Sequence, residues 1–251
     1  MKLIINADDF GLSNAVTYGI YDCIKQGVVT STTQMMNTKA TELASELIIK
    51  NPDLKVGLHT NISYGKPLTN CPSLIKDGYF IKPKDLLNDD NYDEKEIYLE
   101  LKAQYNKFLK LNNKKPTHLD SHLYAHQKFE KVRKQLIKLS EEESIPIREY
   151  ENIFYESVCF ERGFRVLPGE TLKEAKEKFI RLIEMNKDKK TVEIMVHPGY
   201  VDIDMLQFSS YNHQRIMEAA VLLDKEIKKY MSDNNIELVS YLNVEKKYGN
   251  Y

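Results

Sequence analysis

Short apolar runs alternate with longer segments of helical periodicity along most of the chain. Nothing between them resembles the closely spaced pairs of runs and tight turns of a β-hairpin array. Because parallel strands are joined by helical crossovers, this alternation predicts an α/β protein with a mainly parallel sheet of about seven strands. We expect strands at residues 2–7, 28–36, 56–59, 117–121, 145–148, 192–196 and 236–241.

The helical segments carry start and stop signals of their own. Ser13 is a candidate N-cap and Gly27 a stop for the first helix, and Thr171 with Glu174 fits a capping box. The glycines and prolines of residues 61–91 predict a long loop or insertion, and the apolar stretch 158–164 is ambiguous. We expect helices at residues 13–26, 38–50, 93–111, 128–139, 171–185 and 212–231.

Length and composition narrow the class of protein. A chain of 251 residues is usual for an α/β barrel, and no linker or repeat divides residues 1–251, so we expect a single domain. The formal net charge of -1 offers no basic surface for nucleic acid or anionic membranes. Neither a signal peptide nor a membrane-spanning stretch is recognisable, which predicts a cytoplasmic protein. The three cysteines are too widely spaced for a zinc or dithiol motif, and we expect them to be reduced.

Polar residues stand where four of the expected strands end. Asp8 and Asp9 follow the first strand, His59 the third, His122 the fourth, and His197 a later one. In a parallel barrel, ligands bind at the carboxyl ends of the strands, so these side chains can meet despite their separation in sequence. One carboxylate and two imidazoles from Asp9, His59 and His122 would suit a divalent cation and leave a position for water. Asp8 would then be free to act as a general base.

Each of these residues also has a purely structural interpretation. An Asp-Asp pair after a strand often caps a helix, and a single histidine is often a hydrogen-bonded core or surface residue. His213, in a polar context at a helix start, is expected to be structural. It is the conjunction of four polar strand ends that favours an active site.

Four sequence blocks resemble the signature of the YdjC-like carbohydrate deacetylases, also called chito-oligosaccharide deacetylases. They occur in the same order as in that family and extend from position 7 to position 200. The chain departs from the family pattern at Leu123-Tyr124-Ala125, where further histidines are common, and at Thr60, which makes substrate-side contacts harder to assign. The blocks are Ala7-Asp8-Asp9-Phe10-Gly11, Gly57-Leu58-His59, Thr117-His118-Leu119-Asp120-Ser121-His122 with His126, and Val196-His197-Pro198-Gly199-Tyr200.

The resemblance implies a distorted parallel (β/α) barrel, similar to a TIM barrel, that removes acetyl groups from amino-sugar oligosaccharides with one divalent metal ion. It implies Asp9, His59 and His122 as metal ligands, Asp8 as the base and His197 as the group facing it. Magnesium or zinc is the implied ion, and two imidazole ligands favour zinc-like metals. Asp120 and His126 are candidates for substrate contacts or for holding the ligands in place.

The expected partner is a small acetylated oligosaccharide, with or without a phosphate group, and the chain is a candidate homodimer. Two other classes of protein stay open at this point. One is a different metal-dependent sugar hydrolase or isomerase on the same barrel, since a fold does not determine a function. The other is a non-catalytic sugar-binding protein, for which replacement of Asp8 would leave ligand binding unchanged.

Overall fold

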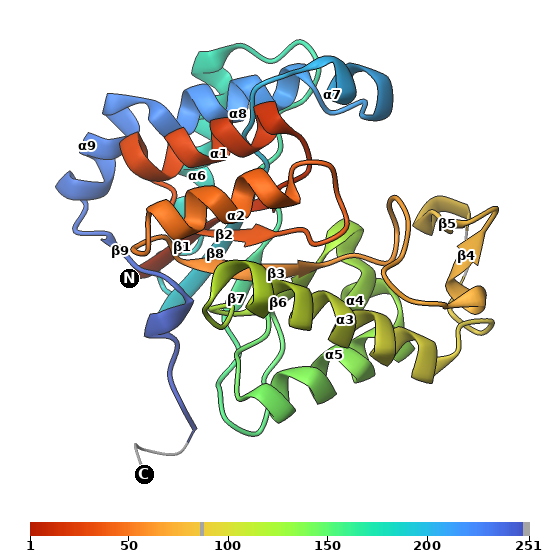
Figure 1. Ribbon diagram of the computed structural model, residues 1–251. Coiled ribbons are helices and arrows are strands. Elements are labelled where there is room, and N and C mark those ends of the chain that lie inside the picture. The colour runs from red at the N-terminus through yellow and green to blue at the C-terminus, as the bar shows by residue number, and fades with distance from the viewer. Residues whose placement is uncertain (86–87, 248–251) are drawn as a thin grey trace.

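The computed structural model describes residues 1–85 and 88–247 and shows a parallel sheet surrounded by helices (Figure 1). The sheet order is β6-β3-β2-β1-β8-β7, with β9 beside β1, and every pairing along this path is parallel. This arrangement confirms the predicted α/β barrel-like fold of about seven strands. The strands are β1 (Lys2–Phe10), β2 (Ser31–Gln34), β3 (Val56–Thr60), β6 (Leu119–Ser121), β7 (Cys159–Glu161), β8 (Thr191–Val196) and β9 (Glu237–Leu238).

The helices follow the strands around the sheet. Contacts run in the order α6, α8, α1, α2, α3 and α5, so the helix after each strand packs beside the helix of the neighbouring strand. This spatial order of helices and strands is that of a (β/α) barrel whose sheet is not closed between β6 and β7 in the described part of the chain. The helices are α1 (Asn14–Gln26), α2 (Thr41–Lys50), α3 (Glu94–Asn112), α4 (Ala125–Lys128), α5 (Glu130–Glu143), α6 (Leu172–Met185), α7 (Ile203–Phe208), α8 (His213–Leu223) and α9 (Lys225–Asp233).

The segment expected as a long loop carries a small substructure. An antiparallel pair of two-residue strands projects to one side of the molecule (Figure 1). Residues 86–87 of this segment, and residues 248–251 of the expected domain, lie outside the described part of the chain. The short elements, of which η1, η2, η3 and η4 are 3-10 turns, are η1 (Pro72–Leu74), β4 (Ile75–Lys76), β5 (Tyr79–Phe80), η2 (Pro83–Asp85), η3 (His122–Tyr124) and η4 (Tyr241–Asn243).

Several predicted elements were wrong in extent or type. The first strand continues through Asp8 and Asp9 to Phe10, β2 covers only Ser31–Gln34 of the expected residues 28–36, and α2 begins at Thr41 instead of residue 38. Residues 145–148 form a single bridge between Ile147 and Leu119 instead of a strand, because Pro146 has no N–H to donate to a ladder. The helix expected at residues 212–231 is divided at Asp224, whose extended backbone ends α8 and whose side chain caps α9. The last strand is cut to Glu237–Leu238 because Ser240 already caps the turn η4.

The middle of the sheet forms the core and fixes the loops above it. Residues 3–10 of β1 are all buried, with β2 and β8 as neighbours. Gly19 of α1 packs so closely on the segment after β8 that a Cβ atom there would lie 2.6 Å from the backbone nitrogen of Tyr200. The Thr171–Glu174 capping box is present at the start of α6, as predicted. In the described part of the chain, no helix combines the length and apolar character needed to cross a bilayer.

Candidate active site

A break in strand pairing turns both aspartates toward the same side of the sheet. Along β1 and β2, Ala7 pairs with Thr32 and Phe10 with Gln34, so β1 has one extra residue between the two pairs. Successive side chains of a regular strand point to opposite faces, and such a bulge re-aims them. Asp9 has a positive φ of 74°, which is uncommon outside glycine. As a result, Asp8 and Asp9 both line the same cleft.

Asp9, His59 and His122 form a compact group of three ligand atoms. Asp9 Oδ1 lies 3.0 Å from His122 Nδ1 and 3.4 Å from His59 Nε2, and one ligand atom from each residue lies within 4.8 Å of the others. Oδ1 is buried, and no donor among the described residues meets it with hydrogen-bond geometry. A carboxylate oxygen without a donor beside two imidazole nitrogens fits a divalent cation with mixed oxygen and nitrogen ligands.

Asp120 holds the His59 ring from the other side. Its Oδ1 lies 2.7 Å from His59 Nδ1, and its Oδ2 accepts a hydrogen bond from Thr33. Ligating histidines typically donate their second ring N–H to such a carboxylate, which fixes the tautomer and the ring orientation. Burial lowers the pKa of His59, but Asp120 and Asp8 outweigh it and raise that pKa to about 10. Surroundings that favour a proton on this ring also favour a metal cation.

Asp8 is enclosed by the buried guanidinium of Arg148. Asp8 Oδ1 and Oδ2 accept from Nη2 at 2.6 Å and Nη1 at 2.8 Å, and Oδ1 also accepts from the side chain of Asn6. Arg148 Nη1 lies 2.8 Å from Asp120, and its Nε and Nη2 lie 2.9 and 2.7 Å from Glu193 Oε1. Burial opposes ionisation of Asp8, but Arg148 holds its pKa well below the usual range. Asp8 is therefore ionised at neutral pH, as a proton acceptor must be.

A second arginine contacts Asp9. Arg215 of α8 donates from Nη2 to Asp9 Oδ2 at 2.6 Å, while its Nε and Nη1 have no hydrogen-bond partner among the described residues. Burial raises the pKa of Asp9, but Arg215 and then His122 reverse this and hold that pKa well below its ordinary value. Asp9 is thus bound through Oδ2 and turns Oδ1 toward the histidines.

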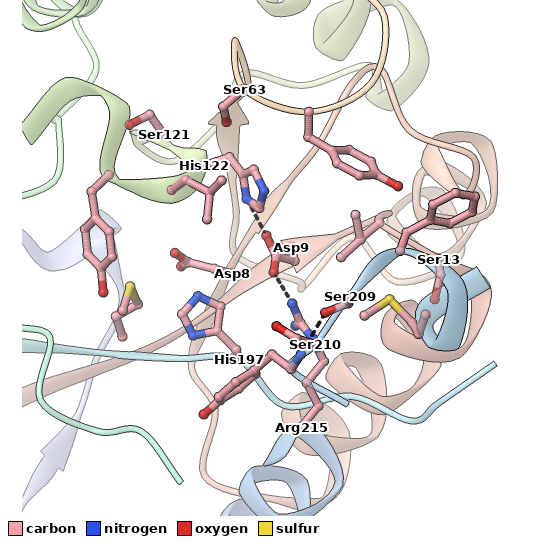
Figure 2. A pocket seen from close by; sticks show the side chains of 18 of the residues that line it. Asp8, Asp9, Ser13, Ser63, Ser121, His122, His197, Ser209, Ser210 and Arg215 are labelled. Carbon is pink, nitrogen blue, oxygen red and sulfur yellow. Dashed lines mark hydrogen bonds and ion pairs between the residues drawn. The ribbon is translucent and has the colours of Figure 1, made fainter. Parts of the chain in front are cut away.

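His197 completes the cleft wall opposite the metal-ligand candidates. Its backbone N–H donates to Glu218 Oε2 at 2.5 Å, and Glu218 also accepts from the Tyr211 hydroxyl. Burial lowers the pKa of His197 to about 4, so the imidazole is neutral at physiological pH. Figure 2 shows Asp8, Asp9, His122 and His197 directed toward one region of the pocket.

The cleft has a volume of about 530 Å³, within the usual range for small-ligand sites. Asp8, Asp9, His122 and His197 line it, and His59 lies buried directly behind Asp9. His126 does not line the cleft: it is buried and hydrogen-bonded to Ser121. His213 is exposed at the start of α8 and does not line the cleft.

Sequence reasoning missed the charged residues that hold Asp8, Asp9 and His197 in place, although two of them left signals. Arg148 closes an apolar run in the same way as the histidines do, and Glu193 interrupts the apolar strand β8. A charge within a buried strand requires a buried partner. Arg215 and Glu218 lie three residues apart on α8, and nothing local marks them as site residues.

Three comparisons place these features among known proteins. The family model described as YdjC-like protein matches residues 2–233. Carbohydrate deacetylase 2 of Listeria innocua is 40% identical, over 98% of this chain and 100% of that protein. Chitooligosaccharide deacetylase of Proteus mirabilis is 33% identical, over 95% of this chain and 97% of that protein. A crystal structure from Enterococcus faecalis V583, whose name proposes cellobiose-phosphate cleavage, matches with a TM-score of 0.84 and 29% identity, over 96% of this chain and 97% of that one.

Proposed function

This chain belongs to the YdjC-like protein family, and we propose that it is a metal-dependent carbohydrate deacetylase. The reaction is hydrolysis of the N-acetyl group of a chito-oligosaccharide-type substrate, which releases acetate and a free amino sugar. The observation that carries the proposal is the placement of the group Asp9, His59 and His122 beside Asp8 and His197 in one cleft. The relatives named as deacetylases support the same reaction class.

The metal-ligand candidates are Asp9, His59 and His122, and their mixed donor set favours a zinc-like ion over magnesium. When bound, such an ion polarises a carbonyl group and lowers the pKa of a water molecule. Four buried carboxylates (Asp8, Asp9, Asp120 and Glu193) face two buried guanidinium groups in the site, so the excess negative charge favours a divalent cation.

Asp8 is assigned the role of general base. Three of its roughly four lone-pair positions are taken by Arg148 and Asn6, which leaves one on Oδ2 for a proton from the attacking water. His197 faces the reacting group from the other side of the cleft. Since burial keeps its ring neutral, we assign it a hydrogen bond to the developing oxyanion. The proton that Asp8 takes from the water then passes to the leaving amine as the C–N bond breaks.

Cationic side chains on the cleft wall support the proposal that the substrate carries a phosphate group. Eight lysine and arginine residues and three aspartates line the cleft in the described part of the chain. Four of the basic ones have no carboxylate partner among the residues described. A phosphate carries up to two negative charges and is recognised by such side chains. These four are Lys82, Lys84, Lys128 and Arg165.

Lys128→Ala tests this part of the proposal. We expect it to raise KM for a phosphorylated chito-oligosaccharide more than for the unphosphorylated one. Lys110→Ala, which removes an exposed charge from α3 outside the cleft, is the matched control. Equal KM changes for the two substrates would remove the phosphate from the proposal.

Acetate release from a panel of chito-oligosaccharides, with and without a chelator, tests the proposed reaction. In that assay, turnover of a sugar phosphate without acetate release would instead favour another hydrolase or an isomerase.

Metal content of purified variants tests the ligand set. Alanine at Asp9, His59 or His122 should lower metal occupancy strongly, and His213→Ala should leave it unchanged. Full occupancy in both His59→Ala and His122→Ala would refute the ligand set. The cytoplasmic location and the homodimer stay predictions.

A further inference from the structure

The turn η4 brings a buried tyrosine to Glu193, which contacts Arg148. Tyr241 is 1% exposed, and its ring lies parallel to that of His118 with centroids 3.7 Å apart. Ser240 caps the turn, and residues 245–247 are hydrogen-bonded to the segment 154–156, which holds the segment after η4 in place. The Tyr241 hydroxyl donates to Glu193 Oε2.

Glu193 connects this tyrosine to the catalytic side of the sheet. It is fully buried in β8 between the buried Val192 and Ile194. One of its oxygens accepts from Tyr241, and the other faces Nε and Nη2 of Arg148. Replacement of a buried ionic network by apolar side chains is often neutral or stabilising, so fold stability alone gives little reason for a carboxylate here.

The guanidinium of Arg148 makes five N···O contacts of 2.6 to 2.9 Å. Three are hydrogen bonds, two to Asp8 and one to Glu193, and the other two are ion pairs with Asp120 and Glu193. Glu193 contacts the Nε–Nη2 edge, which sets the rotation of the group. That rotation in turn determines where Nη1 and Nη2 meet Asp8 and where Nη1 meets Asp120.

We propose that Glu193 and Tyr241 are positioning residues that orient Arg148 and thereby hold Asp8 in its catalytic position. The inference rests on the proposed function, in which Asp8 is the general base. Tyr241 occupies Glu193 Oε2 and so leaves only Oε1 to Arg148. Without the Tyr241 hydroxyl, the Glu193 carboxylate can turn to bind the Arg148 guanidinium through both oxygens. Nη1 and Nη2 of Arg148 would then move away from Asp8.

The test compares Tyr241→Phe and Glu193→Gln with Tyr105→Phe. The first variant removes one hydroxyl and keeps the ring that packs on His118. Tyr105 is a matched control, because it is also buried and donates its hydroxyl to a glutamate, Glu143, but on the contact between α3 and α5. We expect both test variants to lose about 10- to 100-fold in kcat, the scale of a misplaced catalytic group, with KM and metal content within about twofold of the wild type.

Tyr105→Phe should lower the melting temperature without changing kcat. The inference is overturned if Tyr241→Phe matches this control in kcat, if its loss lies entirely in KM, or if excess metal restores its activity. Should Glu193→Gln fail to fold, Tyr241→Phe carries the test alone. Absence of acetate release by the wild type refutes the proposed function and is therefore distinguishable from failure of this inference.

Discussion

Arg148 and Arg215 each hold one of two consecutive aspartates, but the first arginine is shared among three carboxylates and the second contacts one. Arg148 binds both oxygens of Asp8, donates from Nε to Glu193 and forms an ion pair with Asp120. Arg215 binds only Oδ2 of Asp9, and its Nε and Nη1 lack hydrogen-bond partners among the described residues. Oδ1 of Asp9 stays open toward His59 and His122.

The difference shows how two identical side chains acquire different chemistry. In both, a guanidinium outweighs the burial that favours the neutral acid, so both carboxyl groups have a lowered pKa. Asp8 is enclosed in a closed network that fixes its position and charge. Asp9 is held from one side only, which leaves an oxygen for a cation. The partner arrangement therefore separates the proposed base from the proposed ligand.

The largest expected effect separates the two aspartates directly. Asp8→Asn removes the base and keeps the side-chain shape, so turnover should fall about 100- to 10,000-fold with metal retained. Asp9→Asn should instead lower metal occupancy, because an amide oxygen is a poorer ligand than a carboxylate. Acetate release and metal content measured on both proteins decide between the roles. Near-normal turnover in Asp8→Asn would contradict the assignment.

Stability should distinguish the two arginines. Arg148→Met leaves three buried carboxylates without their cation, and loss of one partner of a buried ion pair costs about 3–5 kcal/mol. Arg215→Met uncovers one carboxylate that the histidines still contact, so its loss should be smaller. Urea denaturation gives both values. If Arg215→Met proves the more destabilising change, the contrast between Arg148, shared among three carboxylates, and Arg215, which contacts one, is wrong.

Asp120 tests whether the support behind His59 matters for the metal. Asp120→Asn keeps the shape but weakens the hydrogen bond that orients the ring, and loss of such a partner lowers metal affinity about 10- to 100-fold. Competition with a chelator measures the affinity. Asp53→Asn, an exposed change beside Lys25, is the control. Equal affinities in the two variants would show that His59 needs no such support.

The smallest expected effect is a pH dependence on the Arg215 side of the cleft. Burial raises the pKa of Glu218 from 4.5 to about 7, against the pull of Tyr211, His197 and Arg215. The folded protein therefore binds more protons than the unfolded chain between these values. This contribution to stability is complete below pH about 4.5 and is lost as the pH rises through about 7.

Glu218→Gln cannot titrate, so the melting temperature of the wild type relative to this variant should fall as the pH rises from 4.5 to 7. Asp8→Asn should not change that window. The lowered pKa of Asp8 stabilises the fold above its ordinary value of 3.8, and this contribution is lost only in acid below it. An unchanged slope in Glu218→Gln would show that Glu218 stays ionised in the folded protein.

Much of the fold and part of the site could be predicted without coordinates. The strand and helix alternation indicated a parallel barrel-like sheet, and polar residues at strand ends indicated the cleft. Boundaries were less predictable where capping decided them, as at Asp224 and Ser240. The role of His126 was also beyond prediction, because a histidine beside a metal motif has the same local pattern whether it faces the cleft or Ser121.

The sequence by itself determined which polar side chains lie near the carboxyl ends of the parallel strands, because periodicity is a local property and ligands bind at the carboxyl edge of such a sheet. Only the tertiary structure decided that Arg148 joins Asp8, Asp120 and Glu193, and that Arg215 reaches Asp9 from a helix 206 positions later. Buried charges must be paired, but their partners come from whichever distant elements the barrel brings together, and no spacing along the chain encodes that choice.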